Sequence, residues 1–268
     1  TTIAKAVYNQ IFRSLEGSSF LEDVREASKQ YNGLLDLQKQ LLSDILKQDH
    51  LLSNVSRGKE LIKRRVGAKK VLVILDDVDG NDQLQALAGR PDWFGSGSRV
   101  IITSRDEHVL NVHKVNAIYK PKELDFHQSL QLFSNYAFGR DQPLGDYIEL
   151  AKNVVCTTGG LPLALEVLGS FLFDKKRLKV WENALEKLKK IPYEEVQEKL
   201  KISYDALNDL EKDIFLNIAC FFIGTPQEYA NYILDGCDLF SVIGIEVLIH
   251  KSLVKIGKYN ELRMHDQL

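Results

Sequence analysis

Two adjacent carboxylates directly follow a run of five apolar residues. Residues 71–75 are Val, Leu, Val, Ile and Leu, and Asp76 and Asp77 come next. A strand that is apolar on both faces belongs in the interior of a parallel sheet, and open parallel sheets bind their ligands at the carboxyl ends of the strands. The spacing therefore predicts two acids at a binding edge, which is the Walker B pattern of nucleotide-binding folds.

The two acids have different expected roles. Mg²⁺ keeps most of its hydration shell and accepts few carboxylates, so we expect Asp76 to hold it through water. Asp77 is expected to orient or deprotonate an attacking water, which makes it the candidate catalytic residue. The alternative is that the pair only caps the turn that leaves a buried strand. The motif alone leaves both interpretations open.

A cation follows the next expected strand. Residues 95–98 predict a turn, residues 99–103 predict a second buried strand, and Arg105 lies two positions beyond it. A planar, permanently charged guanidinium suits phosphate oxygens. We therefore expect Arg105 near a terminal phosphate, although without Asp76 and Asp77 upstream it would read as a solvated loop residue.

Two hydroxyl residues begin the chain, at the start of a helix expected over residues 2–15. A phosphate-binding loop ends in Gly-Lys-Ser/Thr at a helix start, with the hydroxyl on Mg²⁺ and the helix amides on phosphate. Thr1 and Thr2 fit the end of such a loop, with Thr1 as the metal ligand. We expect its glycines and lysine before Thr1, in a longer protein of which this chain is an internal piece. A simple helix cap is the alternative.

The segments that must position these residues alternate between strand and helix patterns. Apolar periodicity predicts helices at residues 2–15 and 34–45. A short helix is expected at residues 82–88, and residues 20–24 are a further strand candidate. From about residue 122 the patterns are helical only, and near residue 193 short helices precede two short strands. The helices expected there are residues 126–138, 147–157, 162–173, 178–191, 196–204, 211–222, 226–234 and 241–250, and the strands are residues 253–256 and 262–264.

The predicted fold class is an α/β P-loop-type nucleotide-binding domain with a parallel sheet truncated at its amino terminus. An all-α helical domain and a winged-helix domain are expected to follow it. The expected boundaries of the three domains are residues 1–121, 122–192 and 193–268.

Composition excludes several classes of function. The net charge is −2, so no basic excess indicates nucleic acid or an anionic membrane as a partner. The longest apolar run, residues 214–223, includes Asn217 and is about half the length that spans a membrane. The cysteines, Cys156, Cys220 and Cys237, have no metal-ligand spacing. They are expected to be buried thiols in a reducing compartment.

Five segments, in order, resemble the NB-ARC module of plant disease-resistance receptors, which are nucleotide-binding, leucine-rich-repeat immune receptors. They read TTIAKAVY (residues 1–8), LDDVD (75–79), GSRVIITSRD (97–106), GLPLA (160–164) and MHD (264–266). Asp79 and the segment FLEDVRE at residues 20–26 are similar to the subclass with an amino-terminal Toll/interleukin-receptor domain.

The resemblance implies that ADP or ATP binds together with Mg²⁺. It implies that Pro162 packs against the adenine, that His265 reaches the β-phosphate of ADP, and that Asp266 supports the same turn. Without the resemblance, Pro162 reads as a helix-start proline and His265 as an ordinary hairpin histidine.

The resemblance also implies a molecular switch that controls defence signalling. ADP would hold the domains closed, and ATP would open them and permit self-oligomerisation. Toll/interleukin-receptor and leucine-rich-repeat domains are expected outside these residues, in a protein that is cytoplasmic or shared between cytoplasm and nucleus. Hydrolysis is expected to be at most a slow Mg²⁺-dependent ATPase activity.

Two other functions use the same features. A conventional ATPase motor would use Asp76 and Asp77, but it should carry an arginine finger and a substrate channel that the sequence does not reveal. A nucleic-acid-binding regulator would use the winged helix, where basic and acidic residues alternate without forming a basic stripe. The switch is the leading prediction, and nucleic acid is not an expected partner.

Overall fold

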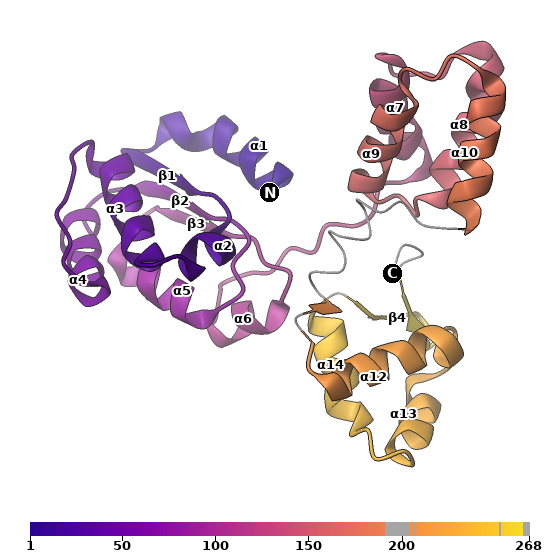
Figure 1. The fold of residues 1–268 in the computed structure, drawn as a ribbon. Helices are drawn as coiled ribbons and strands as arrows, with labels where there is room; N and C mark the ends of the chain where they lie inside the picture. The colour runs from indigo at the N-terminus through magenta and orange to yellow at the C-terminus, as the bar shows by residue number, and fades with distance from the viewer. Residues whose placement is uncertain (191–203, 206, 252, 265–268) are drawn as a thin grey trace. The chain divides into compact units, whose positions relative to one another are not determined.

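The computed structural model describes residues 1–190, 204, 205, 207–251 and 253–264 (Figure 1). The chain divides into two compact units, Thr1–Ile118 and Tyr119–Leu268. No described helix is both long enough and apolar enough to cross a membrane.

The first unit, whose residues are all described, is built on a parallel sheet of three strands. These are β1 (Gly17–Leu21), β2 (Val71–Leu75) and β3 (Arg99–Ile102). Strand β2 lies between the other two and is buried along its whole length. The predicted parallel sheet with an apolar central strand is therefore confirmed.

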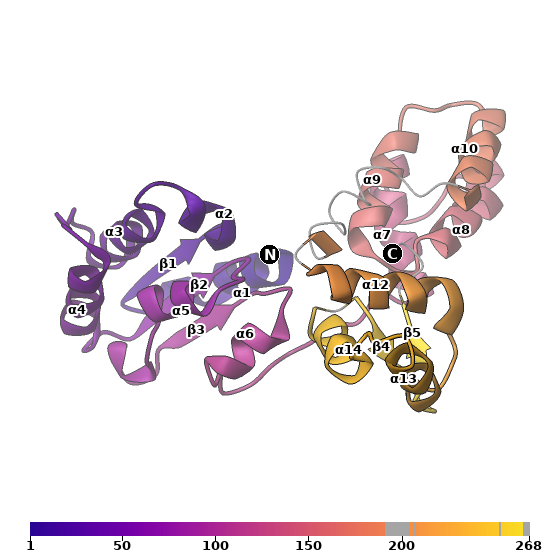
Figure 2. The same cartoon turned by 60° about the horizontal axis from the view of Figure 1, so that its bottom comes forward.

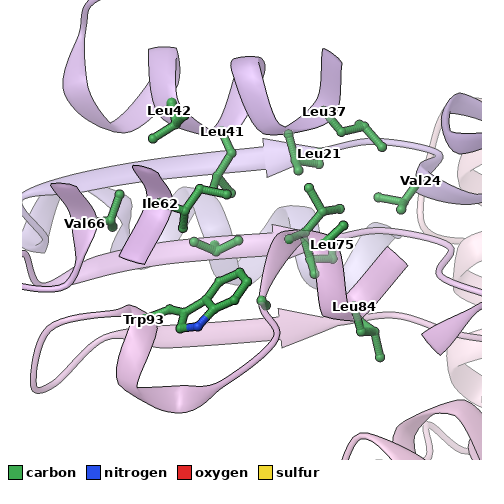
Figure 3. Packing of buried hydrophobic residues seen from close by; sticks show 14 of the residues in the cluster. Leu21, Val24, Leu37, Leu41, Leu42, Ile62, Val66, Leu75, Leu84 and Trp93 are labelled. Carbon is green, nitrogen blue, oxygen red and sulfur yellow. The ribbon is translucent and has the colours of Figure 1, made fainter. Parts of the chain in front are cut away.

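Alternate side chains of β2 enter two different hydrophobic clusters. Val73 and Leu75 pack with residues of helices α2 to α5 (Figure 3), whereas Leu72 and Ile74 pack beneath α1. The sheet is therefore sandwiched between α1 and the other helices (Figure 1 and Figure 2). The helices of this unit are α1 (Thr2–Ile11), α2 (Val24–Lys29), α3 (Gly33–Leu46), α4 (Val55–Val66), α5 (Asn81–Leu87) and α6 (Glu107–Val112).

Two elements at the start of the chain differ from the sequence-based prediction. The helix expected over residues 2–15 ends at Ile11 and continues as a 3₁₀ turn, Phe12–Ser14. The strand expected at residues 20–24 lies at Gly17–Leu21, since Asp23 takes a left-handed conformation and Val24 begins α2. The small polar residues that open β1 carry little hydrophobic signal, so their pairing with β2 could not be seen in the sequence.

The second unit begins with helices α7 (Phe126–Phe138), α8 (Ile148–Thr157), α9 (Pro162–Leu172) and α10 (Leu178–Lys190). Their shared core is centred on the buried Trp181, whose ring packs against Phe133, Phe138 and Tyr147. The helices predicted in this region are therefore confirmed, and each of them begins and ends within one residue of its expected bounds.

A separate hydrophobic core lies near the carboxyl end of the chain. It is formed by α12 (Asp209–Asn217), a π-helical segment (Ile218–Phe222), α13 (Gln227–Asp235), α14 (Ser241–His250) and the antiparallel pair β4 (Lys255–Ile256) and β5 (Leu262–Arg263). Helices followed by a short hairpin agree with the predicted winged helix, although both strands are shorter than expected. The helix expected at residues 196–204 falls almost wholly outside the described residues, and the boundaries of the three domains stay predictions.

The prediction of buried cysteines is wrong. Cys156, Cys220 and Cys237 are all free and exposed. On α8 the buried neighbours of Cys156 are Val154 and Val155, so the thiol lies on the outer side of the helix. These cysteines therefore give no argument about the redox compartment.

We predict that Gly58→Ala lowers the free energy of unfolding by about 1–3 kcal/mol, the usual cost of overpacking a core. A methyl group at Gly58 would overlap Oε1 of the buried Gln38. Gln38 cannot easily move away, because its Nε2 donates to the carbonyl oxygens of Val55 at 3.1 Å and Ala86 at 2.8 Å.

Urea denaturation of the chain measures this loss, with Gly145→Ala as the matched control. Apart from the two neighbouring residues in the chain, no atom lies within 4 Å of the methyl group that this control adds. Equal stability of the two variants would contradict the argument.

Candidate functional site

The three parallel strands end together, and polar residues follow each of them. Leu21 is in register with Leu75, and Leu75 with Ile102. We call the edge formed by the residues after these three the carboxyl edge. It gathers Asp76 and Asp77 from behind β2 and Arg105 from behind β3, as the strand order predicts.

Asp76 is the most enclosed acid at the carboxyl edge, with 1% of its surface exposed. Its Oδ2 accepts a hydrogen bond from the hydroxyl of Thr1 at 2.8 Å, and its Oδ1 accepts one from the hydroxyl of Thr103 at 2.6 Å. The Thr103 hydroxyl in turn accepts from the backbone N–H of Asp77 at 2.9 Å. Two hydroxyl groups therefore hold the Asp76 carboxylate in one orientation.

This set of oxygen atoms fits Mg²⁺. Mg²⁺ prefers hard oxygen ligands and is usually bound by one or two carboxylates, with the remaining positions left to water and phosphate. Thr1 and Asp76 provide a neighbouring hydroxyl and carboxylate of that type. Among the described residues, no group of three or more His, Cys, Asp and Glu could form an all-protein metal site.

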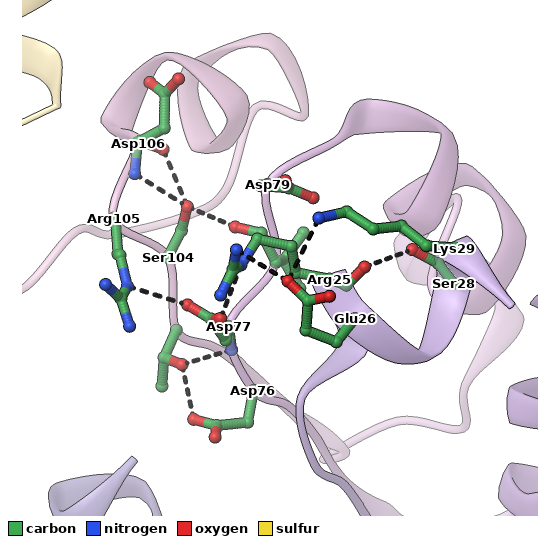
Figure 4. A network of polar contacts seen from close by, with 12 residues as sticks. Arg25, Glu26, Ser28, Lys29, Asp76, Asp77, Asp79, Ser104, Arg105 and Asp106 are labelled. Carbon is green, nitrogen blue, oxygen red and sulfur yellow. Dashed lines mark hydrogen bonds and ion pairs between the residues drawn. The ribbon is translucent and has the colours of Figure 1, made fainter. Parts of the chain in front are cut away.

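Asp77 is bound at both of its carboxylate oxygens by arginines (Figure 4). Arg25 Nε donates to Oδ2 at 2.8 Å, and Arg105 Nε donates to Oδ1 at 3.1 Å. The backbone of Asp77 is left-handed, with φ of 56°, and its carbonyl oxygen accepts from the N–H of Arg25 at 3.1 Å. A non-glycine residue in this conformation marks a local constraint.

The two arginines lower the pKa of Asp77. Burial alone would raise the pKa of this carboxyl, but the hydrogen bond from Arg25 and the charges of Arg105 and Arg25 outweigh that effect. Burial acts to lower the pKa of Arg25. The hydrogen bond to Asp77 and the negative charge of Asp77 outweigh burial, so the pKa of Arg25 is raised overall. The carboxylate is therefore ionised at neutral pH and is a weak proton acceptor in this arrangement.

The loops around Asp77 are tied together by side-chain amide and hydroxyl groups. Gln83 Oε1 accepts from the backbone N–H of Asp79 at 3.0 Å, and its Nε2 donates to Ser28 Oγ and to Asp79 Oδ1, both at 2.8 Å. Ser104 Oγ donates to the carbonyl oxygen of Val78 at 2.6 Å. The segments after β1, β2 and β3 therefore form one hydrogen-bonded network.

The structure thus brings together four of the predicted site residues: Thr1, Asp76, Asp77 and Arg105. Thr2 is the first residue of α1 and is exposed. It lies one position from Thr1, at the helix start where the resemblance expects phosphate.

The remaining predicted residues belong to the second unit. Pro162 is exposed at the first position of α9, after Gly160, whose φ of 75° suits glycine. His265 and Asp266 lie outside the described residues.

Sequence reasoning missed two residues of the site, Arg25 and Thr103. Arg25 lies 52 positions before Asp77, inside the segment FLEDVRE. The sequence predicts a strand at residues 20–24 of that segment, and nothing local indicates a partner for Arg25. Thr103 does carry a signal, since it is the hydroxyl residue that ends the expected strand beside Asp76.

The fold and the carboxyl edge define a P-loop-type nucleotide-binding module followed by helical and winged-helix regions. Residues 1–143 match the NB-ARC domain, and residues 208–268 match the winged-helix domain of Disease resistance protein Roq1-like proteins. The chain belongs to the NB-ARC family.

The chain is similar to several curated plant proteins. It is 46% identical over 268 residues to Disease resistance protein RUN1 of Vitis rotundifolia, covering 99% of this chain and 20% of the relative. It is 41% identical over 273 residues to TMV resistance protein N of Nicotiana glutinosa, covering 99% of this chain and 23% of the relative. The chain spans about a fifth of the length of these relatives.

We predict that the stabilising effect of Asp77 depends on pH. Because its pKa is lower in the folded chain than in the unfolded chain, its ion pairs contribute fully above the unfolded value of about 3.9. The contribution is lost as pH falls through the folded pKa. The stability difference between the parent and Asp77→Asn should therefore shrink on acidification.

Thermal unfolding between neutral and acidic pH measures this difference. Asp36→Asn removes the same charge from an exposed pair with Lys39 and should have little effect at any pH. If the difference in stability between the parent and Asp77→Asn stays constant as the pH falls, the stabilising role of these ion pairs is refuted.

Proposed function

We propose that this chain is the ADP/ATP-binding switch of a plant immune receptor that controls defence signalling. The observation that carries the proposal is the carboxyl edge, where two hydroxyls hold Asp76 and Arg105 is paired with Asp77. Membership of the NB-ARC family and the printed function of the relatives, disease resistance, support it.

In this proposal each residue at the carboxyl edge has one task. Thr1 and Asp76 hold Mg²⁺, which would neutralise charge on the phosphates, and the amide of Thr2 faces phosphate at the start of α1. Asp77 orients a water, and Arg105 contacts the terminal phosphate. The glycine-rich loop and lysine expected before Thr1 would supply most of the other phosphate contacts.

The switch requires contacts that differ between the two nucleotides. A ligand shifts an equilibrium only by what it binds better in one state. Pro162 against adenine and His265 at the β-phosphate would favour a closed ADP state of the domains at residues 1–121, 122–192 and 193–268. Arg105 would report a γ-phosphate, and opening would permit self-oligomerisation.

Within the complete protein, Toll/interleukin-receptor and leucine-rich-repeat domains would flank these residues. The protein would act in the cytoplasm, or in both cytoplasm and nucleus.

The geometry favours a switch over the alternative of a conventional ATPase motor. A fast ATPase needs a general base whose pKa lies near the operating pH. Both oxygens of Asp77 are bound by guanidinium groups, and its pKa is low. Hydrolysis would therefore be slow and would reset the switch.

We predict that Asp76→Ala lowers Mg²⁺-dependent hydrolysis much more than nucleotide affinity. A residue that binds the metal through water typically changes metal affinity or activity by about 10–100-fold when it is lost. Hydrolysis and ADP affinity are measured on the full-length protein. Asp79→Asn is the control, since its carboxylate receives a bond from Gln83 and lies in the same loop. If Asp76→Ala hydrolyses ATP at the parental rate, Asp76 does not belong to the metal site.

We also predict that His265→Ala raises the ATP-bound fraction and causes signalling without a ligand. A hydrogen bond to a charged phosphate contributes about 1.5–3 kcal/mol, so its loss changes the closed-to-open ratio by roughly tenfold or more. Asp266→Val should act in the same direction. The nucleotide retained by the purified full-length protein measures the effect. Unchanged ADP retention in both variants would mean that this turn is only structural.

A further inference from the structure

Arg25 is held against Asp77 at two points. Its Nε donates to Asp77 Oδ2 at 2.8 Å, and its backbone N–H donates to the Asp77 carbonyl oxygen at 3.1 Å. Its Nη1 lies 2.9 Å from Glu26 Oε1, and only 15% of the side chain is exposed. The position of Arg25 is therefore fixed by α2, independently of Arg105.

Arg105 is bound to the same carboxylate in a different way. Its side chain is 43% exposed, and its Nε is 3.1 Å from Asp77 Oδ1. Exposed ion pairs contribute little free energy, because water and salt screen them. An incoming anion can therefore displace the Arg105 guanidinium from Asp77 at a lower free-energy cost than the Arg25 guanidinium.

We propose that Arg25 is a positioning residue that holds Asp77 by Oδ2 and thereby keeps Oδ1 directed toward Arg105. The proposal rests on the proposed function, because it takes Asp77 to face the terminal phosphate. Arg25 is expected to touch Asp77 and not the nucleotide.

The consequence is a coupling between phosphate sensing and the acceptor strength of one carboxylate oxygen. When a terminal phosphate attracts Arg105, Oδ1 loses its cationic donor, while Arg25 keeps the carboxylate oriented. Oδ1 has two lone pairs and can accept from a water in either state, but it is the stronger acceptor once the guanidinium has left. With ADP, which has no terminal phosphate, Arg105 stays on Asp77 and Oδ1 stays the weaker acceptor.

Without Arg25 the carboxylate is free to turn. Both oxygens can then meet the planar fork of Arg105, and bidentate guanidinium–carboxylate pairs are stronger than single hydrogen bonds. Arg105 would be held more firmly by Asp77 and would be less available to the terminal phosphate. Loss of Arg25 should therefore reduce the preference for ATP over ADP, although Arg25 does not contact either nucleotide.

The test compares Arg25→Gln with Arg25→Lys and a control, Lys29→Gln. Lys29 lies on the same helix and pairs with Glu26 at 3.1 Å, but it makes no bond to Asp77. Arg25→Lys keeps the charge and loses the planar fork, so it also serves if Arg25→Gln does not fold.

The measurement is the affinity of the full-length protein and its variants for ADP and for a non-hydrolysable ATP analogue.

We expect Arg25→Gln to lower the ratio of ATP-analogue to ADP affinity by about fivefold or more, the lower end of typical couplings between sites. Arg25→Lys should restore part of the ratio, and Lys29→Gln should match the parent. If the parent binds nucleotide and Arg25→Gln keeps the parental ratio of ATP-analogue to ADP affinity, the positioning role is overturned and the proposed function stands. A parent that binds neither nucleotide would overturn the proposed function itself, and the positioning role with it.

Discussion

The burial of strand β2 along its whole length is the constraint on which the first unit depends. Because both faces of this strand are covered by helices, its side chains cannot carry polar chemistry. Polar groups are confined to the positions where the parallel strands end. The register of Leu21, Leu75 and Ile102 brings those positions to one edge, where residues far apart in the chain meet.

At that edge, charge pairing determines what each acid can do. Asp76 receives hydrogen bonds from two neutral hydroxyls, a hard oxygen environment that suits a metal ion. Asp77 receives two guanidinium groups, which neutralise it. Adjacent residues of the same type thus have different chemistry, and the difference comes from Thr1 and from the segments after β1 and β3.

The sequence predicted the features that local patterns encode. The strand at residues 71–75, the helices after residue 122 and the meeting of Asp76, Asp77 and Arg105 all follow from apolar runs and strand order. It did not predict Arg25, because the bond to Asp77 depends on the left-handed turn at Asp23 and on the pairing of β1 with β2. The cysteines were misjudged for a similar reason: apolar neighbours in sequence do not decide which side of a helix a residue occupies.

The exposed cysteines make the two units experimentally distinguishable. Cys156 lies on α8, Cys220 lies in the π-helical segment and Cys237 follows α13, so every thiol of the chain belongs to residues 119–268. A maleimide dye or spin label would therefore attach to the second unit and leave the carboxyl edge chemically untouched. Paired with a single cysteine introduced on α4, such labels would test, through a change in spectroscopic distance, the movement between the units that the proposed switch requires.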